Sequence, residues 1–202
     1  MKPTTGLRQL DDDLFVEGEP LIVYGEPASG KTNLVLKIVK ESLRSGMSTA
    51  YISTEGSIVV ERMEEMGILD FPNLSIGFAN SLPHLAQLVS WAAASGYSLI
   101  AIDSVNSLYR SSVGFARRAN EIFLGILAMM KIAAASGKWV VATAQVREVG
   151  EEVEPSGADL IGFYFSNIAR IYRIGGGRRV LEVRGKKYIL NIIEVDVVLA
   201  AT

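Results

Sequence analysis

Short apolar runs alternate with longer segments of helical period along most of the chain. The apolar runs predict strands at residues 21–24, 49–53, 74–78, 98–103 and 139–144. The segments between these strands predict helices at residues 33–44, 58–66, 82–94 and 119–135. This alternation is typical of a mostly parallel sheet that is covered by helices.

The pattern changes in the last third of the chain. From residue 168 onward, apolar runs follow one another without helical segments, which predicts antiparallel strands. Residues 146–162 are acidic, contain Pro155 and show no clear period, which predicts a mobile loop. We interpret the three aspartates at residues 11–13 as a solvated acidic turn. The expected fold class is α/β, in a single domain over residues 1–202.

Composition narrows the possible classes of function. The 202 residues are 49% hydrophobic, which is enough for a full core, and the formal net charge is −2. That charge gives no overall positive field, so any contact with nucleic acid must be local. Zero cysteines and one histidine exclude disulfides, thiolate nucleophiles and histidine metal clusters. The start lacks an apolar signal region and no uncharged stretch could cross a bilayer, so we expect a cytoplasmic protein without a membrane partner.

The strongest chemical signal directly follows the first predicted strand. The sequence there satisfies the phosphate-loop pattern G-x-x-x-x-G-K-[ST], with Gly25, Glu26, Pro27, Ala28, Ser29, Gly30, Lys31 and Thr32. Its glycines let backbone N–H groups point at phosphate oxygens, and the helix that begins near Asn33 adds the positive end of its dipole. Lys31 is expected to reach the β and γ phosphates of ATP, and the Thr32 hydroxyl to bind Mg²⁺.

A second signal is the carboxylate that ends the fourth predicted strand. Asp103 follows the apolar run at residues 99–102, as a Walker B aspartate does. A buried strand would hold this carboxylate at the carboxyl edge of the sheet, beside the phosphate loop. Asp103 is therefore predicted to bind Mg²⁺ directly or through water.

Further motifs resemble the RecA/RadA recombinase family over nearly the whole chain. Thr54-Glu55-Gly56 follows the second strand, and Glu61-Arg62 follows shortly after. The segment that begins at Gly6-Leu7-Arg8 is similar to the family's leading segment, and Thr143-Ala144-Gln145-Val146 is similar to the end of a later strand. The glycine-rich turn that the family normally carries before the first strand is largely missing. The resemblance implies a RecA-like P-loop ATPase core.

The resemblance also implies roles for three of these residues. Glu55 matches the family's glutamate that polarises the attacking water, and Gln145 matches the glutamine that senses the γ phosphate. Lys31, Glu55 and Gln145 are thus the expected catalytic residues. Arg62 matches an arginine that packs against adenine, where a guanidinium plane can stack.

The chain differs from a full recombinase in having only about twenty residues ahead of the core. In this it is similar to the archaeal recombinase paralogues, the RadB and RadC-like accessory proteins. That resemblance implies a slow, DNA-stimulated and Mg²⁺-dependent ATPase that acts as a mediator or regulator of a RadA-type recombinase in homologous recombination and repair. The resemblance also implies weak self-association. Because ATP in this fold lies between neighbouring subunits, a core that polymerises poorly is expected to hydrolyse ATP slowly.

Single-stranded DNA is the expected nucleic-acid partner, since two loops of the family bind it, and they correspond here to residues 106–118 and 146–165. The first loop contains Arg110, Arg117 and Arg118, with Tyr109 and Phe115 between them, so it offers cations for phosphates and rings for stacking. The second loop is acidic, which argues against tight binding there. A separate basic cluster could bind DNA, a partner or a neighbour's nucleotide, and consists of Arg170, Arg173, Arg178, Arg179, Arg184, Lys186 and Lys187.

Two other functions stay open at this point. A KaiC-like signalling ATPase shares the leading segment and the phosphate loop, but typically carries two adjacent glutamates after the second strand. The single Glu55 between Thr54 and Gly56 favours the recombinase paralogues. A nucleotide-gated interaction module without turnover is the second alternative.

Overall fold

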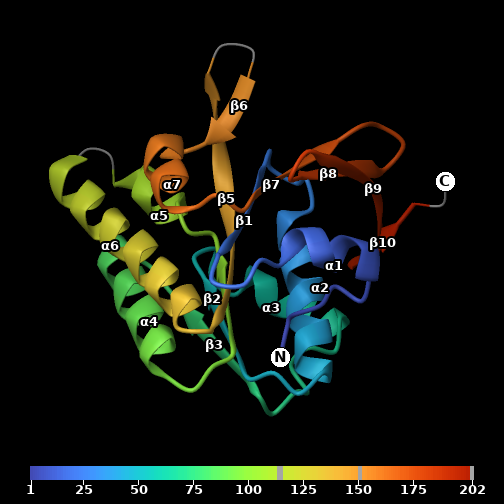
Figure 1. Cartoon of the computed structure of the whole chain (residues 1–202), viewed down its shortest axis with the longest axis horizontal. Helices are drawn as coiled ribbons and strands as arrows, with labels where there is room; N and C mark the ends of the chain where they lie inside the picture. The colour runs from blue at the N-terminus through green and yellow to red at the C-terminus, as the bar shows by residue number, and fades with distance from the viewer. Residues whose placement is uncertain (113–115, 150–151, 201–202) are drawn as a thin grey trace.

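The computed structural model describes residues 1–112, 116–149 and 152–200, which build a twisted sheet with helices on both faces (Figure 1). The strands are β1 (Leu21–Gly25), β2 (Thr49–Ser53), β3 (Leu74–Phe78), β4 (Leu99–Asp103), β5 (Trp139–Val149), β6 (Glu152–Pro155), β7 (Ile168–Arg173), β8 (Arg178–Val183), β9 (Lys186–Ile193) and β10 (Asp196–Leu199). The helices are α1 (Arg8–Leu14), α2 (Lys31–Arg44), α3 (Ile58–Glu65), α4 (Leu82–Ala94), α5 (Ser107–Ser111), α6 (Ala116–Ala135) and α7 (Ala158–Tyr164).

The sheet confirms the predicted mixture of parallel and antiparallel strands. Its order is β10-β9-β8-β7-β1-β5-β4-β2-β3, and β6 pairs with β5 off this path. Strands β3, β2, β4, β5, β1 and β7 are parallel to their neighbours in this series, whereas β8, β9 and β10 join as antiparallel strands. Strand β7 was expected to be antiparallel, but it is parallel to β1 and antiparallel only to β8. The chain reaches β7 through α7, and such a crossover allows parallel pairing.

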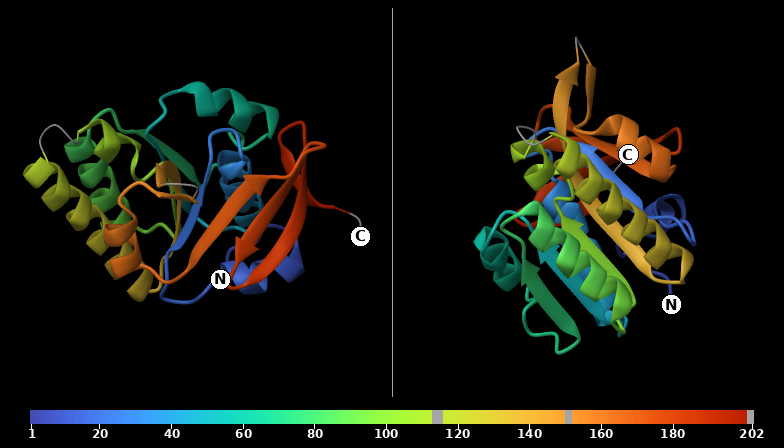
Figure 2. Two further views of the ribbon diagram at one scale, coloured as in Figure 1. Left: turned by 90° about the horizontal axis from the view of Figure 1, so that it is seen from above. Right: turned by 90° about the vertical axis from the view of Figure 1, so that its left-hand side faces the viewer.

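Each face of the sheet carries its own hydrophobic core. Helices α1, α2 and α3 cover one face, and α4, α6 and α7 cover the other (Figures 1 and 2). Alternation along β1 sends Leu21 and Val23 into the first core and Ile22 into the second. Because both faces are buried, β1, β2 and β4 are nearly continuous apolar runs.

The prediction of a mobile loop at residues 146–162 is wrong, because the described residues there form strands and a helix. Strand β5 continues to Val149 and pairs with β6 in an antiparallel hairpin that projects beyond the sheet (Figure 1), and α7 follows. The ion pair between Arg147 and Glu154 joins the two strands of this hairpin. Its sequence, with Glu148, Glu152, Glu154 and Pro155, lacks the apolar alternation of a typical strand and therefore resembles a loop.

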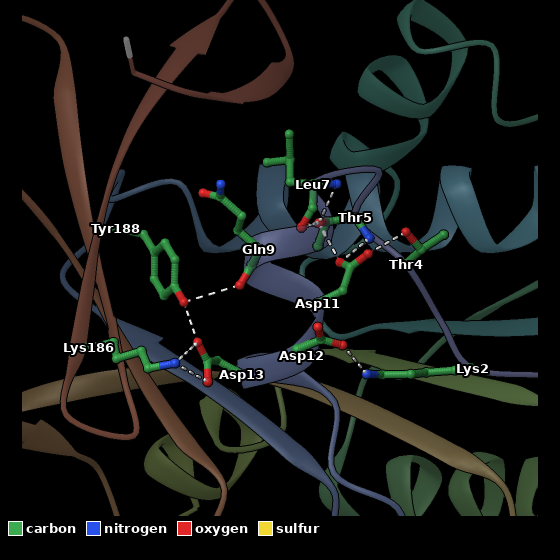
Figure 3. Close-up of polar contacts among 10 residues, drawn as sticks. All are labelled: Lys2, Thr4, Thr5, Leu7, Gln9, Asp11, Asp12, Asp13, Lys186 and Tyr188. Atoms are coloured by element: carbon green, nitrogen blue, oxygen red, sulfur yellow. Dashed lines mark hydrogen bonds and ion pairs between the residues drawn. The ribbon is translucent and has the colours of Figure 1, made fainter. Parts of the chain in front are cut away.

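The predicted acidic turn at residues 11–13 is also wrong, because these aspartates lie in α1 (Figure 3). Asp11 accepts hydrogen bonds from the backbone N–H of Thr5 at 2.7 Å and from its hydroxyl at 2.6 Å. Asp13 accepts from Lys186 and Tyr188 of β9. Asp11 therefore ties the start of the chain to α1, Asp13 ties α1 to β9, and Asp12 stays exposed.

Candidate nucleotide-binding site

A cleft of about 680 Å³ lies at the carboxyl ends of β1, β2, β4 and β5. Parallel strands bring their carboxyl ends to one edge of the sheet, where such folds bind ligands. The cleft is lined by Gly25, Pro27, Ala28, Gly30, Lys31, Thr32, Asn33, Glu55, Ile58, Glu61, Arg62, Glu65, Asp103, Arg110, Gln145, Val146, Arg179, Ile192, Glu194 and Val195. It thus brings together most of the residues that the sequence assigned to nucleotide chemistry.

The loop between β1 and α2 has room only for glycine at two positions. A Cβ atom on Gly25 would lie 2.0 Å from the carbonyl oxygen of Ile171. At Gly30, φ is +103° and a Cβ atom would lie 2.4 Å from Cδ1 of Ile192. The loop therefore passes close to β7 and β9, and α2 starts with its N-terminus at the cleft, as an anion site requires.

Lys31 spans the phosphate loop from the first turn of α2. Its Nζ donates hydrogen bonds to the carbonyl oxygens of Gly25 and Glu26, each at 2.9 Å. Burial lowers the pKa of Lys31, while the charges of Asp103, Glu55 and Glu26 oppose that shift. The ammonium group is held where a phosphate oxygen can replace a carbonyl as its acceptor.

Asp103 is fixed by hydrogen bonds to both of its carboxylate oxygens. The Tyr51 hydroxyl donates to Oδ2 at 2.8 Å, and the Thr143 hydroxyl donates to Oδ1. Burial and the neighbouring Asp103 charge raise the pKa of Tyr51 well above its usual range, so the phenol stays a donor. The Asp103–Ser104 peptide bond is cis. These contacts hold the carboxylate rigidly at the end of β4.

The chemistry of the donors suits Mg²⁺ as the metal of this cleft. Thr32 and Asp103 both line the cleft, and they offer the oxygen ligands that a hard cation prefers. In residues 1–112, 116–149 and 152–200, no group of three or more His, Cys, Asp or Glu side chains could hold a metal ion.

Glu55 and Gln145 face each other across the cleft. Gln145 Nε2 lies 3.4 Å from Glu55 Oε1, and Arg110 Nη1 donates to Gln145 Oε1 at 2.9 Å. The backbone of Gln145 is held separately by Asn106, which accepts from its N–H and donates to its carbonyl, both at 2.8 Å. Arg110, which the sequence assigned to DNA, thus lies in the nucleotide cleft.

The outer rim of the cleft comes from two distant parts of the chain. Arg62 and Ile58 of α3 are exposed on one side. Ile192 of β9 and the β9–β10 turn at Glu194 and Val195 contribute to the same lining. The sequence motifs identified Arg62 but not the C-terminal rim, because strand patterns alone do not show which loop the last strands approach.

Arg117 and Arg118 lie outside the cleft lining, in the first turns of α6. The Arg117 side chain is 95% exposed and its Nε lies 3.4 Å from Glu121 Oε1. Arg118 is also exposed. Residues 107–111 form α5, so part of the loop expected at residues 106–118 is helical. Phe115 lies outside the described residues.

Comparisons with known proteins agree with this geometry. Residues 21–156 match the family model described as "ATPase family associated with various cellular activities (AAA)". The "DNA repair and recombination protein RadB" of Methanothermobacter thermautotrophicus is 30% identical over 157 residues, which cover 70% of this chain and 67% of that protein. The chain belongs to the RadB branch of the RecA/RadA family of P-loop ATPases.

Another RadB relative and a solved structure extend the similarity. RadB of Methanocaldococcus jannaschii is 27% identical over 168 residues, which cover 77% of this chain and 79% of that protein. The "Crystal structure of the RadB recombinase" superposes with a TM-score of 0.77 at 23% identity and covers 98% of each chain. The RecA-like fold expected from the sequence is thereby confirmed. Helices of the described residues are too short or too polar to span a membrane.

Proposed function

We propose that this RadB family member binds ATP with Mg²⁺ and hydrolyses it slowly, and that single-stranded DNA stimulates the reaction. We also propose that it acts as an accessory factor of a RadA-type recombinase in homologous recombination and DNA repair. The observation that carries the proposal is one cleft that contains Lys31, Glu55, Asp103 and Gln145. The names of its relatives, which refer to DNA repair and recombination, support the biological role.

Each of these residues has a distinct part in the proposed reaction. Lys31 and the amides at the start of α2 would bind the phosphates. Thr32 and Asp103 would hold Mg²⁺, which neutralises charge on the phosphate oxygens when it is bound. Glu55 would accept a proton from, or orient, the attacking water, and Gln145 would donate its amide N–H to a phosphate oxygen.

The DNA and protein partners rest on separate features. The exposed Arg117 and Arg118 would bind phosphates of single-stranded DNA, at the end of the same segment that carries Arg110. A RadA-type recombinase is the proposed protein partner, because these relatives are recombination proteins by name. We also propose weak self-association, and slow turnover by the isolated protein would follow from it if ATP lies between neighbouring subunits.

ATP hydrolysis by the purified protein, with and without single-stranded DNA, tests the enzymatic part. Glu55→Gln should bind ATP as tightly as the wild type but lose hydrolysis, since the amide cannot take a proton. Lys31→Ala should lose ATP binding itself, because it removes the charge at the phosphates. Binding is measured by titration with a fluorescent ATP analogue, and hydrolysis by release of labelled phosphate.

The outcomes separate the proposal from its two alternatives. Normal ATP hydrolysis by Glu55→Gln would contradict the catalytic role of Glu55. ATP binding without measurable hydrolysis by the wild type would contradict the ATPase and favour a nucleotide-gated interaction module. If single-stranded DNA does not change the ATP hydrolysis rate at any salt concentration, a KaiC-like signalling ATPase would be favoured. Stimulation by DNA that disappears in Glu55→Gln supports the proposal.

A further inference from the structure

We propose that Arg110 is a positioning residue of the ATPase site, which acts on Glu55 through the side chain of Gln145. The Arg110 guanidinium donates to Gln145 Oε1 at 2.9 Å, and the amide nitrogen of Gln145 lies 3.4 Å from Glu55 Oε1. All three side chains line the same cleft. This inference rests on the proposed ATPase function and names a residue that the family motifs did not assign to it.

The chemistry of the two neighbours fixes the orientation of the Gln145 carboxamide. Arginine has donors only, so it must face the amide oxygen. An ionised glutamate has acceptors only, so it must face the amide nitrogen. Arg110 therefore holds the amide with its N–H groups toward Glu55. Without Arg110, the carboxamide can rotate, and a half-turn would interchange the positions of its oxygen and nitrogen.

The contact affects the side chain of Gln145 without being needed to hold its strand. Asn106 anchors the Gln145 backbone with two hydrogen bonds of 2.8 Å, and the β1–β5 ladder pairs Gln145 with Gly25. Arg110 itself is exposed on α5. Loss of the guanidinium should thus leave the fold and the phosphate loop intact while it releases the amide.

Charge also favours this role over a purely structural one. Among the side chains that the structure describes, which exclude those of residues 148–152, no carboxylate forms an ion pair with Arg110, and its hydrogen-bond partner is a neutral amide. A hydrogen bond from a charged donor is stronger than one between neutral groups, so it can select one amide orientation. The guanidinium polarises the amide, which makes its N–H groups better donors to an anion.

Single-turnover ATP hydrolysis without DNA tests the inference, because the absence of DNA removes any effect of Arg110 on DNA affinity. Arg110→Ala should reduce the hydrolysis rate about tenfold, the scale of one missing charge-assisted hydrogen bond, and leave the Kd for a fluorescent ATP analogue within about twofold. Arg110→Lys keeps a charged donor and should lie between Arg110→Ala and the wild type. Arg44→Ala is the control, since Arg44 is an exposed residue at the far end of α2, paired with Glu41.

A double-mutant cycle with Gln145→Ala tests whether Arg110 acts through the amide. In the Gln145→Ala background, Arg110→Ala should have no further effect on the hydrolysis rate. Additive losses, an unchanged rate in Arg110→Ala, or a Kd that rises in step with the loss of rate would each overturn the positioning role. The proposed ATPase fails only if the wild type shows no measurable hydrolysis, so its failure is distinguishable from failure of the positioning role.

Discussion

At the scale of single residues, Gly25 shows how tightly the phosphate loop is packed. A methyl group at this position would meet the Ile171 carbonyl at 2.0 Å and Ser29 Oγ at 2.9 Å. Gly25→Ala must therefore displace backbone, and we expect it to lower the free energy of unfolding by about 1–3 kcal/mol and to weaken ATP binding. Urea denaturation and titration with an ATP analogue measure the two effects.

The matched control for this substitution is Gly125→Ala on α6. Gly125 is exposed, and an added Cβ atom would have no atom within 4 Å. Since alanine favours a helix over glycine, this variant should be as stable as the wild type or more stable by up to about 1 kcal/mol. If Gly25→Ala and Gly125→Ala had equal free energies of unfolding, the backbone around Gly25 would accommodate a methyl group without cost, contrary to the prediction.

Residues within a local motif could be predicted from the sequence, but residues that support them from other strands could not. Lys31 and Asp103 stand out because each follows an apolar strand in a recognisable pattern. Tyr51 and Thr143 hold Asp103 from β2 and β5, and only the sheet order brings them together. Their one local signal is a polar group in a buried strand, which must find a partner.

At the scale of elements, helix α1 is held on the sheet by an ionised carboxylate. The Tyr188 hydroxyl and the Lys186 ammonium group lower the pKa of Asp13 below its usual value of 3.8 (Figure 3). Asp13→Asn should reduce the free energy of unfolding by about 1 kcal/mol near neutral pH, because it weakens charged hydrogen bonds at a partly exposed site. Urea denaturation at several pH values measures the loss.

The pH dependence of that loss follows from the direction of each shift. A lowered pKa of Asp13 stabilises the folded state above pH 3.8, and this contribution disappears as the pH falls through the folded-state pKa. The hydrogen bond to Asp13 raises the pKa of Tyr188 from 10.0 to about 12, so the contact also weakens as the pH rises over that range.

Asp12→Asn is the control for the Asp13 variant. The Asp12 side chain is 86% exposed and pairs only with Lys2 among the described residues, so the change should stay within about 0.5 kcal/mol. A difference between wild type and Asp13→Asn that persists unchanged at pH 2 would argue against the ion pair as the source of the stability.

Long elements with strong periodicity were predicted well, and short ones were missed. Helices α2, α4 and α6 and strands β1 to β4 lie close to their expected bounds, whereas β5 begins as expected but continues five residues beyond residue 144. Helices α1, α5 and α7 have only five to seven residues each, too few for a period to appear. The β5–β6 hairpin was missed because its charged residues and Pro155 give no apolar alternation in the sequence.

At the scale of the whole molecule, the sheet order decides what the cleft contains. Sequence patterns predicted the early parallel strands, but the path that places β4 and β5 between β2 and β1 depends on contacts between distant segments. The same limit applies to the C-terminal strands. Their approach to the phosphate loop at Ile192 joins the first and last thirds of the chain into one site.

The net charge of the molecule makes DNA binding depend on a local surface. With a formal charge of −2, attraction to DNA must come from exposed cations such as Arg117 and Arg118. Replacing both with Ala should weaken single-stranded DNA binding and reduce the salt slope of log K by about 0.7 for each phosphate that is no longer neutralised. Fluorescence anisotropy with a labelled oligonucleotide over a series of salt concentrations measures both quantities, with Arg44→Ala as the control. An unchanged slope would indicate that DNA binds elsewhere, for example at the exposed Arg173 and Arg178 of the β7–β8 hairpin. The same titration with those two arginines replaced by Ala tests that site.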